Sequence, residues 1–225
     1  MITLPDQPLA QRILRAALAR ESPPQQLFLF GLPGTGKRAA AHEIAWSLMD
    51  PAGTHERTAD ALDLMVVTAL GAQILLQDLE RGLAEISTRP VLMRRRVLII
   101  DGAERLREQE GAERLLKTLE EPPPLSHILL VTDNADKVKD TLRSRCLPVP
   151  FRPPGWRTIA AHLEAEGATP AVAAGRARAE GPSALGASPF EREMRGIGVD
   201  LGVAALRGEG APAARVKAVQ AKMEE

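Results

Sequence analysis

The sequence predicts an α/β fold with a mostly parallel sheet, followed by a smaller all-α domain. Three observations support this prediction. Short apolar runs alternate with amphipathic segments, a glycine-rich turn joins the first run to a helix, and the composition changes after Phe151. Alternating strands and helices favour parallel pairing, because each right-handed crossover returns the chain to the same end of the sheet.

The expected strands are short apolar runs bounded by proline, glycine or charged residues. Runs of four to eight residues with this composition are typical of buried strands. They lie at 25–30, 62–68, 97–100, 127–132 and 147–151.

The expected helices carry apolar residues at helical spacing between these strands. They cover 38–49, 74–87 and 104–121, with a short helical stretch at 141–142 before the last strand. After a linker of two prolines and a glycine, two more helices are expected at 158–166 and 170–180, and then a loop at 181–189. We therefore expect a nucleotide-fold domain at 1–152, a helical lid at 153–190 and a short helical tail at 191–225.

Composition and charge exclude several classes of protein. Lys plus Arg and Asp plus Glu each total 29, so the net charge is zero and nothing draws the whole chain toward nucleic acid or an anionic membrane. Apolar residues make up 44%, which excludes a disordered chain. The single cysteine, Cys146, excludes an internal disulfide and a four-cysteine zinc site. No run approaches the roughly 20 apolar residues of a membrane helix. We expect a cytoplasmic protein without a membrane partner.

The segment Gly31-Leu-Pro-Gly-Thr-Gly-Lys37 matches the phosphate-loop pattern G-x-x-x-x-G-K between an expected strand and an expected helix. Glycines let the backbone N–H groups point at a phosphate, and the lysine and the helix N-terminus add positive charge. A plain glycine turn is the alternative. The pattern predicts an ATP phosphate site made by Gly31, Pro33, Gly34, Thr35, Gly36, Lys37 and Arg38.

Two departures from this pattern affect hydrolysis. Arg38 stands where a Ser or Thr hydroxyl would hold Mg²⁺, and a guanidinium cannot bind a cation. Asp101 ends an apolar strand in the manner of a Walker B carboxylate, although such an aspartate can also be a simple cap. Gly102 follows it, where hydrolysis needs an acid that orients water. ATP binding is compatible with these residues, whereas ATPase activity is expected to be absent or weak, Mg²⁺ binding weak or absent, and no metal site is expected.

The segments GLPGTGK, VLIIDGAERL, LLKTLEEPPP, ILLVTDN and SRC occur in this order. Together they resemble the AAA+ clamp-loader ATPases of bacterial DNA polymerase III, and most closely those of the delta-prime type. The resemblance implies a RecA-like AAA+ P-loop domain, a helical lid and a helical collar. It places Thr132 and Asn134 in the sensor 1 region. It also implies that Arg145 of the SRC motif is an arginine finger that reaches the ATP of a neighbouring subunit.

The resemblance further implies a role in DNA replication. The chain would help load the sliding clamp on primed DNA, acting mainly as a non-hydrolysing subunit. Its partners would be the gamma/tau and delta subunits, with the clamp contacted indirectly and primer–template DNA through the complex. Segment 50–60 lacks the family's zinc-binding cysteines, so no zinc is expected. Segment 181–186 lacks the sensor 2 arginine, and 191–225 is too short for a full collar, so we expect a truncated or vestigial one.

Several alternatives remain open from the sequence. An ATP-hydrolysing motor subunit is favoured by Lys37 and Asp101 and opposed by Arg38 and Gly102. A stand-alone adaptor module with the same fold is favoured by the short C-terminal segment. Arg145 can instead be a surface ion-pair partner. The run Arg94–Arg96 is either a solvated turn or part of a basic surface that faces DNA.

Overall fold

A computed structural model describes residues 4, 6–58, 61–69, 73–106 and 110–186. The expected tail at 191–225 and the end of the expected lid lie outside the described residues. Within the described ranges, no helix is long and apolar enough to cross a membrane.

The centre of the fold is a five-stranded parallel sheet in the order β2-β3-β4-β1-β5. The strands are β1 (Gln26–Phe30), β2 (Leu64–Thr68), β3 (Arg96–Asp101), β4 (Ser126–Thr132) and β5 (Leu147–Pro150). In the register, Phe30 of β1 pairs with Thr132 of β4, and Asp101 of β3 pairs with Val131. The predicted α/β fold with a parallel sheet is therefore confirmed, and the ends of β1, β3 and β4 lie at one edge.

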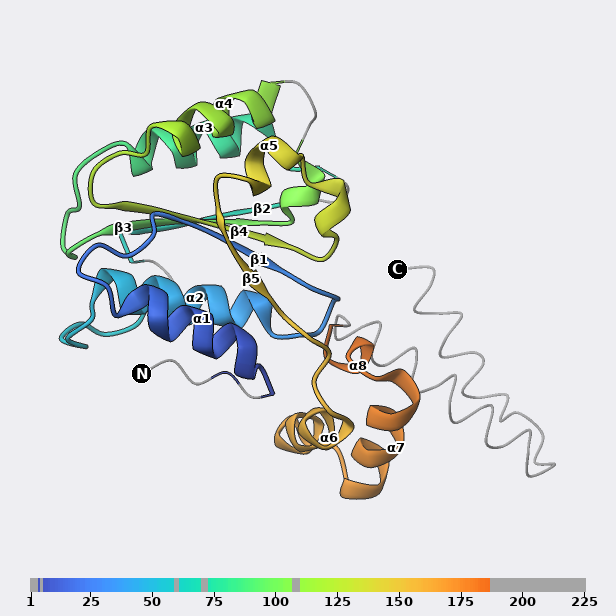
Figure 1. The fold of residues 1–225 in the computed structure, drawn as a ribbon. Helices are drawn as coiled ribbons and strands as arrows, with labels where there is room; N and C mark the ends of the chain where they lie inside the picture. The colour runs from blue at the N-terminus through green and yellow to red at the C-terminus, as the bar shows by residue number, and fades with distance from the viewer. Residues whose placement is uncertain (1–3, 5, 59–60, 70–72, 107–109, 187–225) are drawn as a thin grey trace, which may run out of the picture.

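Helices cover both faces of the sheet (Figure 1). One face carries α1 (Pro8–Leu18) and α2 (Lys37–Met49), and the other carries α3 (Leu76–Ile86), α4 (Glu110–Glu120) and α5 (Asp140–Arg143). Strand side chains alternate between the two layers. In β3, Ile99 packs in the core on the α1 and α2 side, and Leu98 packs in the core on the opposite side.

Two expectations about helices were wrong in detail, and one helix was not expected. Helix α1 was not expected, because its buried side chains are mostly small, as at Ala10 and Ala17. The expected helix at 104–121 is instead a 3₁₀ turn, Ala103–Arg105, followed by α4. The expected loop at 181–189 contains a short helix, α8 (Ser183–Gly186).

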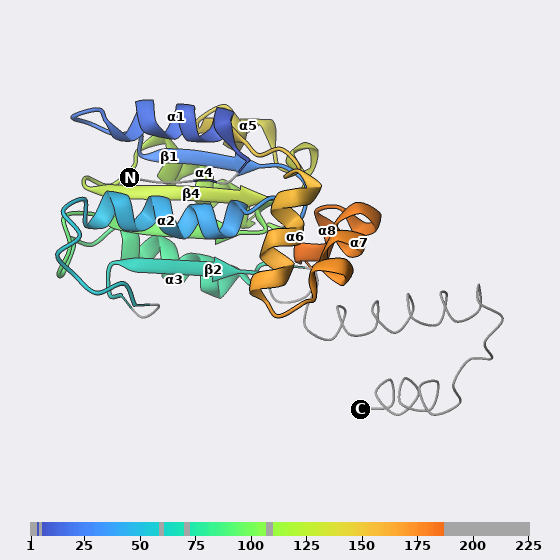
Figure 2. The same ribbon diagram turned by 90° about the horizontal axis from the view of Figure 1, so that it is seen from below.

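The helices after β5 have a core of their own. Helices α6 (Trp156–Ala165), α7 (Pro170–Glu180) and α8 bury Ile159, Leu163 and several alanines against one another. They lie beyond the carboxyl ends of the strands (Figure 2). The side chain of Asp6 accepts hydrogen bonds from Gly155 N, at 3.0 Å, and from the Thr158 hydroxyl. These contacts attach α6 to the segment that precedes α1.

Cys146 is a buried packing residue. Its thiol lies in the core between the sheet and the helices α3 to α5 and donates to Leu142 O at 3.4 Å. Burial raises the pKa of this thiol to about 12. A thiol protonated at neutral pH is a poor nucleophile, so Cys146 contributes to packing and not to chemistry.

Candidate nucleotide-binding site

The glycine-rich loop connects the end of β1 to the start of α2, as the phosphate-loop pattern requires. Gly36 is the N-cap of α2 with φ +84°, and Gly34 has φ +73°. These left-handed conformations cost little only in glycine. The first N–H groups of α2 have no helical acceptor, so they can bind an anion at this end of the helix.

Lys37 is held inward by three oxygen atoms. Its side chain is only 3% exposed, and Nζ lies 2.6 Å from Leu32 O, 3.2 Å from Thr35 Oγ1 and 2.7 Å from Asp133 Oδ1. Asp133 follows β4, which is the neighbour of β1 in the sheet. The Lys37 ammonium group therefore already has a carboxylate partner, which a bound phosphate would have to replace.

Arg38 and Asp101 form an ion pair at the same edge. Arg38 Nε lies 3.0 Å from Asp101 Oδ1 and 2.7 Å from Oδ2. The Arg38 side chain is 65% exposed and that of Asp101 is 12% exposed. The guanidinium of Arg38 thus covers the carboxylate that would otherwise face a metal ion.

A second hydrogen-bonded group lies around Thr132 at the end of β4. Its hydroxyl donates to Glu104 Oε2 at 2.5 Å and accepts from Asn134 N at 3.1 Å. The Asn134 side chain accepts from Asp136 N and caps the following 3₁₀ turn, Ala135–Lys137. Glu104 lies in the first turn of the 3₁₀ helix Ala103–Arg105, which Gly102 precedes as N-cap with φ +86°. From there its carboxylate reaches the Thr132 hydroxyl.

The loop borders a cavity of about 610 Å³. The phosphate-loop residues from Pro33 to Arg38 form one wall, and Asp133, Phe151, Thr158 and Leu185 lie around the rest. The segment before α8 closes tightly on the loop, since a Cβ on Gly34 would lie 1.8 Å from Pro182 O. Helices α6 and α8 therefore contribute to the same cavity as the phosphate loop.

These residues fit the phosphates of a nucleotide but do not fit its Mg²⁺ ion. The α2 N-terminus and Lys37 supply donors and positive charge for phosphate. Mg²⁺ needs oxygen ligands. At the two positions where a phosphate-loop protein would supply them, this chain has Arg38, which offers no oxygen, and Asp101, whose carboxylate is already paired with Arg38. Among the described residues, no three His, Cys, Asp or Glu side chains form a cluster that could hold a metal.

Arg145 lies apart from this cavity. It follows α5 and precedes β5, and its Nη1 donates to Thr141 O at 2.8 Å. Its Nη2 lies 2.6 Å from Glu120 Oε1 at the end of α4. The side chain is 36% exposed.

The structure thus brings the predicted loop residues and Asp101 together, places Thr132 and Asn134 beside them, and separates Arg145 from all of them. Sequence reasoning missed Asp133 and Glu104 as partners of the site. Both lie within or next to the motifs ILLVTDN and VLIIDGAERL, so their positions at strand ends were a usable signal. The strand order needed to pair them was not available from the sequence.

The strand order, the phosphate loop and the helical segment at the carboxyl edge define a P-loop domain of the AAA+ type. Residues 6–155 match the family described as DNA polymerase III, delta subunit. The chain belongs to this family of clamp-loader proteins.

Individual relatives agree with this membership. The DNA polymerase III subunit gamma of Buchnera aphidicola is 30% identical over 144 residues, covering 59% of this chain and 38% of that protein. The DNA polymerase III subunit delta' of Bacillus subtilis is 26% identical over 178 residues, covering 74% of this chain and 54% of that protein. In fold alone, the chain is also similar to the crystal structure of a DNA polymerase III gamma subunit-related protein from Thermotoga maritima, with a TM-score of 0.56 at 22% identity over 68% of this chain and 49% of that one. The chain spans about two fifths to one half of these relatives' lengths.

Proposed function

We propose that this chain is a non-hydrolysing clamp-loader subunit that supports ATP hydrolysis by a neighbouring subunit. The observation that supports this proposal most directly is the ion pair between Arg38 and Asp101. Arg38 stands where a hydrolysing subunit has the metal-binding hydroxyl, and Asp101 is the carboxylate that would complete the metal site. The ion pair joins these two residues to each other.

Its own site is suited to binding and not to hydrolysis. The α2 N-terminus and Lys37 would hold the phosphates of ATP, with Lys37 exchanging Asp133 for phosphate oxygen. The negatively charged phosphates of ATP would replace the Asp133 carboxylate as the partner of the Lys37 ammonium group. Gly102 leaves no acid beside Asp101 to orient a water molecule. Glu104, three residues after Asp101, accepts a hydrogen bond from the Thr132 hydroxyl instead.

The position of Arg145 favours a role on another subunit. The phosphate loop follows the carboxyl end of β1, whereas Arg145 precedes the amino end of β5, which pairs with β1 in parallel. The register from Leu27 and Leu147 to Phe30 and Pro150 spans three residue steps, or about 10 Å at ~3.3 Å per residue. Arg145 is therefore at the wrong end of the sheet to serve its own loop. A permanently charged planar guanidinium at that end suits a phosphate presented by a neighbour.

The remaining parts of the proposal follow from family membership. Residues 1–152 would be the nucleotide-fold domain and 153–190 the lid that closes on the loop through Pro182. Gamma/tau and delta subunits would be its partners in the cytoplasm, with the sliding clamp and primer–template DNA engaged through the complex.

The test is the steady-state ATPase activity of a reconstituted clamp loader that carries Arg145→Ala. The variant should assemble normally by size-exclusion chromatography and lower the DNA- and clamp-stimulated rate. Loss of such an arginine costs about 10³–10⁵-fold at the site it serves, and less for a complex with other active sites. Arg143→Ala is the matched control, because Arg143 is the last residue of α5, two positions before Arg145, and its ion pairs among the described residues are the local ones with Asp136 and Asp140. Unchanged activity with normal assembly would contradict the proposal.

A motor subunit is the second candidate, because Lys37 and Asp101 are both present. It requires the isolated chain to hydrolyse ATP at about 1 s⁻¹ or faster with Mg²⁺. A rate at background supports the non-hydrolysing role instead.

A further inference from the structure

The sheet edge opposite the phosphate loop exposes apolar side chains. Leu62, Val91, Leu92 and Leu125 are each between 56% and 61% exposed. They lie in the segments that precede β2, β3 and β4. Because the strands are parallel and adjacent in that order, these segments lie side by side along one edge. We call it the amino edge.

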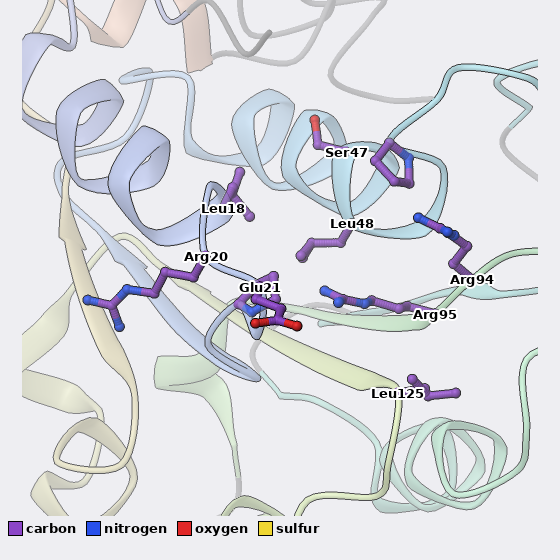
Figure 3. Close-up of a pocket in the computed structure, with 10 residues that line it drawn as sticks. Leu18, Arg20, Glu21, Ser47, Leu48, Arg94, Arg95 and Leu125 are labelled. Atoms are coloured by element: carbon purple, nitrogen blue, oxygen red, sulfur yellow. The ribbon is translucent and has the colours of Figure 1, made fainter.

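A cavity of about 550 Å³ opens at the amino edge (Figure 3). It lies between the C-terminal ends of α1 and α2 and the segments that precede β1, β3 and β4. Arg20, Arg94 and Arg95 line it together with one acid, Glu21. Within the part of the chain that the structure describes, none of the three arginines is ion-paired. The cavity therefore has an excess of two positive charges.

The sequence left two alternatives open for the run Arg94–Arg96, and the structure divides the run. Arg96 is buried, with Nε 3.0 Å from Asp63 Oδ1, so its role is structural. Arg94 and Arg95 face the cavity instead. The run is therefore not a uniformly solvated turn.

His127 orients Arg95 without neutralising it. Its Nδ1 lies 2.9 Å from Pro24 O, and a carbonyl only accepts, so Nδ1 carries the proton and Nε2 accepts from Arg95 Nη1 at 3.3 Å. Burial lowers the pKa of His127 to about 4, so the ring is neutral at pH 7. The charge of Arg95 is thus held in place by a neutral partner.

Leu125, at the mouth of the cavity, has an unfavourable backbone conformation. Its φ is +59°, a left-handed value that is strained in a residue with a Cβ. Its carbonyl accepts from Arg96 N at 2.9 Å, which fixes this conformation. An exposed leucine gains little for folding at such a position, where glycine would be free of strain. Its side chain is available for contact with another molecule.

We propose that this cavity binds an acidic segment of a protein partner, with carboxylates on Arg94 and Arg95 and an apolar side chain against Leu18 and Leu125. Guanidinium groups pair with carboxylates through two parallel hydrogen bonds. The apolar walls match an aliphatic side chain. The C-terminal carbonyls of helices α1 and α2 disfavour anions near the helix ends, and they disfavour a phosphate monoester of nearly two negative charges more than a carboxylate of one. No aromatic residue lines the cavity to stack a base. The surface lies on the α1 and α2 side, whereas Arg145 pairs with Glu120 of α4 on the other side.

Fluorescence anisotropy with the full chain tests this proposal. The probe is a fluorescein-labelled peptide, Asp-Asp-Leu-Leu, and the matched probe is Asn-Asn-Leu-Leu. The double variant Arg94→Gln/Arg95→Gln should bind the acidic peptide at least about tenfold more weakly, since two charged hydrogen bonds are lost. Arg89→Gln is the control, because Arg89 is an exposed arginine of the same loop that does not line the cavity. Its affinity should be unchanged.

A second variant separates binding from folding. Leu125→Gly should keep or raise the midpoint of thermal unfolding, because strain is relieved, yet weaken peptide binding severalfold. Failure of the acidic peptide to bind in 0.1 M salt, or equal binding of the asparagine peptide, would overturn the proposal. So would a 20-base-pair DNA duplex that displaces the peptide and depends on the same arginines, since the cavity would then serve nucleic acid.

Discussion

The guanidinium of Arg38 lies 2.7 Å from the carboxylate of Asp101, so the first turn of α2 is joined to the end of β3. A clamp-loader subunit that hydrolyses ATP needs a hydroxyl at the first position and a free carboxylate at the second. Here the two positions neutralise each other. The phosphate-loop residues are present, and Arg38 is paired with the carboxylate that a Walker-type metal site would use.

Arg38→Thr should make nucleotide binding depend on magnesium. We expect the wild-type chain to bind ATP with similar affinity in Mg²⁺ and in EDTA. The variant should bind roughly tenfold more tightly with Mg²⁺, a gain of ~1.4 kcal/mol, because threonine supplies an oxygen ligand and frees Asp101. Titration of a fluorescent ATP analogue measures this difference. Hydrolysis should stay at background, because Gly102 still supplies no acid.

The matched control for that variant is Arg57→Thr. Arg57 is also exposed and pairs with an α2 carboxylate, Glu43, at 2.9 Å, away from the loop. Its loss should leave the magnesium dependence unchanged. A wild-type chain that already prefers Mg·ATP strongly over metal-free ATP would show that the ion pair opens freely.

Gly34→Ala should disturb the helical segment more than Gly36→Ala does. Both glycines have positive φ, so each alanine costs about 1 kcal/mol through the backbone. Only the new Cβ at Gly34 meets Pro182 O, at 1.8 Å, whereas nothing lies within 4 Å at Gly36. Hydrogen exchange in residues 170–186 should therefore accelerate in the first variant and not in the second. Equal exchange in both would mean that the contact with Pro182 does not hold α8 on the loop.

The sequence was sufficient to predict the strands, the phosphate loop and the approach of Asp101 to that loop. These depend on local patterns, apolar runs and a glycine spacing, and on the parallel sheet that they imply. Helix α1 was missed, although Pro8 at its first turn and the spacing of Ala10, Leu14 and Ala17 were present. Alanine contributes little apolar contrast, so the amphipathic pattern was weak.

Contacts between distant segments could not be predicted. The ion pair of Lys37 with Asp133 requires β4 beside β1, and the sequence gives both strands without their order. Arg96 is part of a basic run that suggests a solvated turn. Its burial depends on Asp63, which lies 33 residues earlier.

Asp63→Ala should be strongly destabilising. The Asp63 carboxylate is fully buried and accepts from Val91 N, Leu92 N and Met93 N, each at 2.8 Å, and from Arg96 Nε. Removing it leaves the Arg96 charge buried and unpaired, a change that costs about 3–5 kcal/mol. Urea unfolding measures the loss. Glu43→Ala breaks an exposed pair and should cost no more than ~1 kcal/mol. Similar losses for the two variants would contradict a structural role for the buried pair.

His127 should make the chain less stable as the pH falls from about 6.5 to 4. Burial lowers the pKa of the folded imidazole to about 4, against 6.5 in the unfolded chain, and the nearby charge of Arg95 adds to the shift. Between these values the unfolded chain binds a proton that the folded chain does not, so stability falls with decreasing pH. The stabilisation is fully present above pH 6.5 and lost near pH 4. The full difference is up to about 3 kcal/mol.

His127→Gln tests this assignment, because glutamine can donate to Pro24 O and accept from Arg95 without titrating. Urea unfolding at pH 7, 5.5 and 4.5 should show a smaller slope for this variant than for the wild type. His42→Gln is the control, since His42 is exposed on α2 and should leave the slope unchanged. For Asp63, burial is the largest single effect and raises the pKa, but the hydrogen bonds that the carboxylate accepts together bring the pKa below 3.8. For Asp6, hydrogen bonds from Thr158 and Gly155 are the largest effects and lower the pKa, with a smaller opposing effect of burial. Their contributions are lost only at still lower pH. If His127→Gln keeps the wild-type slope, another group is responsible for the loss of stability in this range.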